Sequence, residues 1–119
     1  EIVKASIENA KANAQNNGIN NVDFICSSLE DFASSAPNSY HLKPNTVILN
    51  PPRKGCTNKV LDAIGQISSS QIIYVSCNPA TLCRDIKYLQ NYGYKLKSIQ
   101  GFDMFPHSFH CETLAVLTL

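Results

Sequence analysis

The stretch "IIYVSCNPATLCRDI", residues 72–86, joins an apolar run to a polar segment with the pattern of a helix. The near-continuous apolar run at 71–76 predicts a buried strand. Asn78 is a preferred residue for capping a helix, and Pro79 suits the first helical turn. The stretch therefore predicts a strand that passes directly into a helix, with Cys77 at the junction.

The same alternation runs through the rest of the chain. Four apolar residues at helical spacing indicate a helix at 2–17, and Gly18 ends it. A helix at the very start suggests a domain cut from a longer chain. Further strands are predicted at 21–26, 46–50, 94–105 and 111–119, helices at 57–67 and 79–93, a short helix or turn at 27–36 and a loop at 37–45. This order predicts an α/β fold with a doubly wound sheet.

The composition narrows the class of protein. The 119 residues make one domain or part of one, and the formal charge of +1 neither favours nor excludes nucleic acid. No apolar run is long enough to span a membrane. The five cysteines contain no C-x-x-C pair, which favours free thiols in a reducing compartment. We therefore expect a cytoplasmic protein.

The two best strands place polar residues at one edge of the sheet. Asn50 follows the strand at 46–50, and Cys77 follows the strand at 71–76. If these strands are parallel neighbours, both side chains reach the same rim, where ligands bind in such sheets. The segment "NPPR" at 50–53 is then either a rigid turn that ends a strand or a frame around a flat ring. In the second case the amide of Asn50 bonds the edge of the ring.

Cys77 has two interpretations. It is either a small residue buried in a corner or a nucleophile, because the N-terminus of the following helix favours the thiolate form. Glu112, before the last strand, is either a solvated residue or a base near that nucleophile. His107, His110 and Cys111 lie close together, but their spacing matches no common zinc pattern, so no metal is expected.

Three segments together resemble a known family. They are "NPPRKG" at 50–55, "SCNPATL-x-RD" at 76–85 and "FPHS-x-H-x-E" at 105–112. In this order and spacing they are similar to the catalytic half of the S-adenosylmethionine-dependent RNA 5-methyluridine methyltransferases. The resemblance covers residues 1–119 and implies that the chain is the C-terminal part of a methyltransferase catalytic domain.

The resemblance also implies roles for individual residues. Cys77 would be the nucleophile that adds to C6 of uracil, and Glu112 would be the general base. The implied cofactor is S-adenosylmethionine, with Glu1 holding its ribose and Asn50 lying against both cofactor and substrate. The implied partner is tRNA or rRNA with an unstacked uridine. Its other contacts would be Pro51, Arg53 and His107.

The chain departs from the family pattern at three points. The family usually has Asp where this chain has Asn50, which puts discrimination between uracil and cytosine in doubt. It usually has an acidic residue near the adenine where this chain has Ser28. The glycine-rich cofactor loop is absent from the 119 residues. Two alternatives therefore stay open: an amino-group methyltransferase that uses the segment 50–53, and a degenerate domain that binds RNA or a partner.

The fold implied by the resemblance is a Rossmann-like methyltransferase sheet with strand order 3-2-1-4-5-7-6, truncated here by the loss of its first two strands. The strand at 46–50 would then have an unpaired edge, which a protein must cover. We expect the strand at 21–26 to pair with it and complete a five-stranded sheet. The alternative is a dimer through the edges that the truncation exposes.

Overall fold

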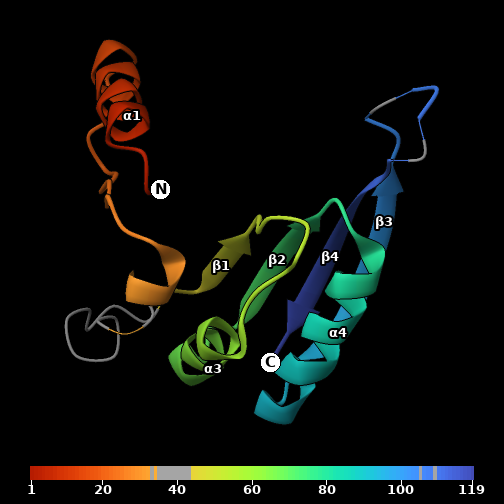
Figure 1. The fold of residues 1–119 in the computed structure, drawn as a ribbon. Helices are drawn as coiled ribbons and strands as arrows, with labels where there is room; N and C mark the ends of the chain where they lie inside the picture. The colour runs from red at the N-terminus through yellow and green to blue at the C-terminus, as the bar shows by residue number, and fades with distance from the viewer. Residues whose placement is uncertain (33, 35–43, 105, 109) are drawn as a thin grey trace.

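The computed structural model describes residues 1–32, 34, 44–104, 106–108 and 110–119, and its centre is a four-stranded sheet (Figure 1). The strands are β1 (Thr46–Leu49), β2 (Gln71–Ser76), β3 (Lys95–Phe102) and β4 (Glu112–Thr118), in the order β1-β2-β4-β3. β1 and β2 are parallel, and β4 is antiparallel to both β2 and β3. This order is the 4-5-7-6 end of the predicted methyltransferase sheet, so that part of the prediction is confirmed.

Two helices cover one face of the sheet. α3 (Asn58–Ile67) and α4 (Pro79–Leu89) pack against it, and α4 continues into the 3-10 turn η1 (Gln90–Tyr92). Alternate residues of β2 and β4 point into this face, as the two-residue period of a strand requires. The buried core consists of Leu49, Cys56, Val60, Leu61, Ala63, Ile64, Ile72, Tyr74, Leu82, Ile86, Leu89, Tyr94, Ala115 and Leu117.

The opposite face of the sheet is apolar but open. The register places Ile48, Ile73 and Val116 on that face, and Ile48 is 70% exposed. Helix α1 (Lys4–Asn16) lies apart from the sheet (Figure 1). The described residues therefore form two layers, and not the helices on both faces that a doubly wound sheet has.

The prediction for residues 21–26 is wrong. They form no strand and do not pair with β1, which has no strand on its outer edge among the described residues. Local contacts hold this segment at the chain start instead, because the Ser27 amide donates to the Glu1 carbonyl (3.0 Å). β1 has only four residues, two of them exposed, so water can satisfy its outer backbone groups without a strand partner.

The other predicted elements agree with the structure to within a few residues where they are described. The helix predicted at 2–17 is α1, and those at 57–67 and 79–93 are α3 and α4 with η1. Residues 29–32 are helical, as allowed for 27–36, but most of the loop predicted at 37–45 lies outside the described residues. Dimerisation through the open edge stays a prediction.

Candidate active site

Cys77 directly follows β2, and Glu112 is the first residue of β4, the antiparallel neighbour of β2. The ladder between β2 and β4 ends with Ser76 opposite Thr113. Cys77 and Glu112 each lie one residue beyond this last pair, and both side chains are half-buried. The register thus brings the two predicted catalytic residues to one rim of the sheet.

The backbone on the C-terminal side of Cys77 is fixed by a helix cap. The Asn78 side chain accepts a hydrogen bond from the Ala80 amide (3.1 Å), and Pro79 begins α4. The Ser76 hydroxyl accepts from the Asn78 amide (3.1 Å). Cys77 therefore lies at the N-terminal end of α4, where the helix dipole favours a negative charge.

The segment 50–53 follows the parallel neighbour of β2, as the sequence predicted. Asn50 is exposed directly after β1, and Pro51 is half-buried. The Arg53 carbonyl accepts from the Asn78 side-chain amide (3.2 Å) and from the Thr81 hydroxyl (3.1 Å). The segment is thereby tied to the N-terminus of α4, next to Cys77.

Arg53 also reaches the segment before β4. Its Nη2 lies 2.9 Å from Nδ1 of His110, so this side chain joins the turn after β1 to the approach of β4. His107, which was predicted to contact the substrate, is exposed with a φ of 65°. Sequence reasoning treated His110 only as a metal candidate. Within the described ranges, no group of three or more His, Cys, Asp or Glu residues could hold a metal ion.

Glu1 and Asn50, the two predicted cofactor residues, line one hollow of about 420 Å³. Its wall also includes Leu29 and Pro51. The Glu1 carboxylate accepts from the Val3 amide (2.8 Å), and this hydrogen bond lowers the pKa of Glu1 below its ordinary value. An ionised carboxylate at this position can accept hydrogen bonds from hydroxyl groups in the hollow.

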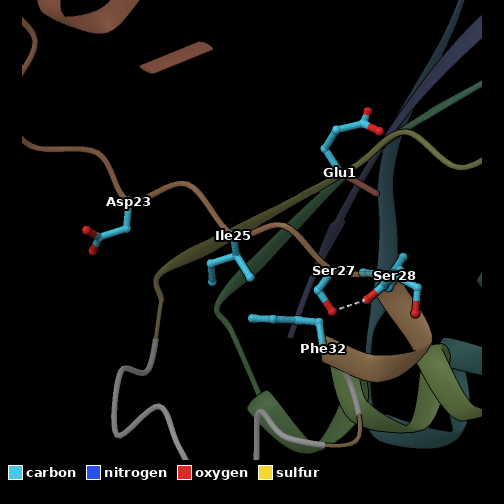
Figure 2. A pocket seen from close by; sticks show the side chains of 7 residues that line it. Glu1, Asp23, Ile25, Ser27, Ser28 and Phe32 are labelled. Carbon is cyan, nitrogen blue, oxygen red and sulfur yellow. Dashed lines mark hydrogen bonds between the residues drawn. The ribbon is translucent and has the colours of Figure 1, made fainter. Parts of the chain in front are cut away.

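A second hollow of about 210 Å³ lies beside Glu1 (Figure 2). Figure 2 shows the carboxylates of Glu1 and Asp23 on opposite sides of the Ile25 and Phe32 side chains. Ser28 also lines this hollow. Its hydroxyl donates to Asp31 Oδ2 (2.7 Å) and accepts from the Asp31 amide (2.9 Å), which is the pattern of a helix cap.

Sequence reasoning gave no role to three residues of the segment 76–85. Thr81, Arg84 and Asp85 all contact the turn at 53–56. Their spacing from Asn78 puts them on one helical face, since residues three and four apart on a helix are neighbours. That spacing was the signal from which their shared contact with the turn could have been inferred.

The fold and this rim define an α/β domain whose candidate site lies at the carboxyl ends of its parallel strands. The chain belongs to the tRNA (uracil-5-)-methyltransferase family, whose sequence profile matches residues 1–119. Among the described residues, no helix has the length and apolar character needed to cross a membrane.

Curated relatives and a solved structure agree with this membership. The chain is 47% identical to an uncharacterised RNA methyltransferase of Thermosynechococcus vestitus, over 99% of this chain and 26% of the relative. It is 42% identical to one of Clostridium tetani, over 99% of this chain and 25% of the relative. The crystal structure of Pyrococcus abyssi tRNA (uracil-54, C5)-methyltransferase with S-adenosyl-L-homocysteine matches with a TM-score of 0.81 at 32% identity. That match covers 99% of this chain and 27% of the Pyrococcus chain. The chain thus spans about a quarter of the length of these proteins.

Proposed function

We propose that these residues act as the C-terminal catalytic part of an enzyme that methylates C5 of a uridine in RNA. The observation that carries the proposal is the register of β2 and β4, whose last pair, Ser76 and Thr113, is followed at the same rim by Cys77 and Glu112, next to the N-terminus of α4. Family membership supports the reaction class. The family and the Pyrococcus enzyme are both named for action on tRNA, and we propose tRNA ahead of rRNA as the substrate.

The proposed chemistry begins at Cys77. Uracil C5 is a poor nucleophile, so the Cys77 thiolate first adds to C6, and the electron pair of the C5–C6 double bond moves onto C5 and O4 as an enolate. The target base must leave its stack to reach Cys77, which fits an unpaired or flipped nucleotide.

Glu112 completes the reaction. After C5 has been methylated, its carboxylate removes the C5 proton, the electron pair re-forms the C5–C6 double bond, and the Cys77 thiolate leaves. The position of Glu112 at the same rim as Cys77 supports this role, because both groups must act on adjacent atoms of one ring.

S-adenosylmethionine, when bound, supplies an electrophilic methyl group on a sulfonium. The hollow lined by Glu1, Leu29 and Asn50 fits part of this molecule, because a carboxylate can accept from both ribose hydroxyls beside apolar walls. Among the described residues that line this hollow there is no glycine to approach the methionyl end closely. The chain therefore offers the ribose side of a cofactor site.

A covalent-adduct assay tests the proposal. The complete enzyme is incubated with tRNA and, separately, with rRNA fragments, and a denaturing gel reports protein bound to RNA. We expect Cys77→Ala to abolish both the adduct and methyl transfer. Cys83→Ala is the matched control, since Cys83 is an exposed cysteine of α4, the helix that begins two residues after Cys77. An active Cys77→Ala enzyme would refute the mechanism.

A further inference from the structure

The turn at 52–56 has little structure of its own. Among the described residues, it contains a single backbone hydrogen bond, from the Gly55 amide to the Pro52 carbonyl (2.8 Å). Pro51 and Pro52 have no N–H to donate. The backbone polar groups of this turn therefore depend on side chains from elsewhere for their partners.

The exposed end of α4 supplies those partners. Asn78 and Thr81 both donate to the Arg53 carbonyl (3.2 and 3.1 Å). Arg84 Nη2 donates to the carbonyls of Lys54 (3.0 Å) and Cys56 (3.1 Å). One face of the helix thus bonds three carbonyls of the turn that follows Asn50.

Asp85 fixes the end of the turn from inside the protein. This carboxylate is fully buried, and its Oδ2 accepts from the Cys56 amide (2.8 Å) and from the Tyr74 hydroxyl (2.5 Å). Its Oδ1 accepts from Arg84 Nε (2.8 Å). Both carboxylate oxygens therefore have hydrogen-bond donors, which a buried polar group requires.

The turn and the helix approach so closely that a side chain at Gly55 would not fit. A Cβ there would lie 2.6 Å from both Arg84 Nη2 and Asp85 Oδ2, and Gly55 has a φ of +74°. Glycine is the default residue where the backbone has a positive φ and packs this closely against its neighbours.

The ion pair joins an Arg84 side chain that is 57% exposed to the fully buried Asp85 carboxylate, and such a pair is weak evidence for stability. What this pair supplies is direction. Arg84 Nη2 donates to the Lys54 and Cys56 carbonyls, Asp85 Oδ2 accepts from the Cys56 amide, and the bond from Arg84 Nε to Asp85 Oδ1 holds the two side chains together. We propose that Arg84 and Asp85 are positioning residues, which hold the turn so that Asn50 and Arg53 face the base that Cys77 attacks. This inference rests on the proposed function.

Two measurements test it, and the first needs no enzymatic activity. In the 119-residue chain, we expect Arg84→Met to raise the hydrogen-exchange rate of the Cys56 amide at least tenfold relative to the Ile72 amide of β2. Arg84→Lys, which keeps a charged donor, should restore most of the protection. Unchanged exchange at Cys56 in Arg84→Met would overturn the proposal.

The second measurement separates positioning from a purely structural role. In the complete enzyme, Arg84→Met should slow RNA adduct formation at least tenfold. Alkylation of Cys77 by iodoacetamide, which needs no aligned base, should stay within twofold. Gly55→Ala disturbs the same contact from the side of the turn and should have the same effect on both rates. With two variants, the test can still be made if one of them folds poorly.

Asp62→Asn is the matched control. Asp62→Asn removes another carboxylate, which accepts hydrogen bonds from Tyr88 and Tyr92 and contacts no residue of the turn. It should leave the rates of RNA adduct formation and of Cys77 alkylation unchanged. Adduct formation within twofold of normal in both Arg84→Met and Gly55→Ala would overturn the proposal. An unsubstituted enzyme that forms no adduct would refute the proposed function instead, while the exchange measurement still decides whether Arg84 holds the turn.

Discussion

Substitution of Asn78 tests whether the residue after Cys77 both caps α4 and ties the turn after β1. Its Oδ1 caps the helix at the Ala80 amide, and its Nδ2 donates to the Arg53 carbonyl. Replacing an Asn cap by Ala costs about 1 kcal/mol. Loss of a half-exposed hydrogen bond adds about 0.5–1 kcal/mol. We therefore expect Asn78→Ala to lower the free energy of unfolding by about 1.5–2 kcal/mol.

Asn78→Asp separates the two contributions. Aspartate also caps helices and favours the positive end of the dipole, but it cannot donate to the Arg53 carbonyl. We expect this variant to lose only about 0.5–1 kcal/mol. Urea unfolding followed by circular dichroism measures both, and with an m-value of about 1.5 kcal/mol per molar the Ala variant shifts the midpoint by about 1 M. A loss below about 0.5 kcal/mol in Asn78→Ala, or equal losses in both variants, would refute the reasoning.

Three further predictions concern the cofactor, the pH dependence of stability and the base. Calorimetric titration should detect no binding of S-adenosylmethionine by the 119-residue chain, since Glu1 alone cannot replace a glycine loop, and micromolar affinity would contradict this. Hydrogen bonds from Tyr92 and Tyr88 lower the pKa of Asp62 below its ordinary value of 3.8. Their contribution to the stability of the fold is therefore present above pH 3.8 and is lost as the pH falls through the lowered pKa. The hydrogen bond to Asp62 raises the pKa of Tyr92 from its ordinary value of 10 to about 12, so the free energy of unfolding also declines as the pH rises from 10 towards 12. Urea unfolding of Asp62→Asn should show neither pH dependence. A pH profile unchanged by the substitution would argue against the pair. In the complete enzyme, Glu112→Gln should let the methylated RNA adduct accumulate on denaturing gels, because methylation precedes proton removal, and normal turnover would exclude this role.

Apolar periodicity predicted the elements whose partners lie within the chain. The run at 71–76 lies between β1 and β4, and alternate residues of it are buried. Its apolar pattern therefore agrees with its place inside the sheet. The segment 21–26 has a similar pattern but no strand beside it among the described residues. A strand depends on its neighbours for its hydrogen bonds, and the sequence of one segment does not say whether a neighbour is present.

The candidate site was predictable where it depends on strand ends and not where it depends on loop paths. Asn50 and Cys77 follow two parallel strands, so their shared rim could be deduced from the order of elements. The contact between Arg53 and His110 joins two loops that are 57 residues apart, and no local pattern encodes their meeting. The contacts of Arg84 and Asp85 with the turn are an intermediate case. Helical spacing places these residues on one face of the helix, but it does not say what that face contacts.

Release of the C5 hydrogen is the most direct test of the central claim, that Cys77 activates C5 of a uridine for methylation. The complete enzyme is given tRNA whose uridines carry tritium at C5, together with S-adenosylmethionine whose methyl group carries carbon-14. We expect one tritium to be released to water for each methyl group transferred, and we expect Cys77→Ala to stop both while Cys83→Ala stops neither. Methyl transfer without tritium release would place the methyl on another atom, as an amino-group methyltransferase does, and would contradict the claim.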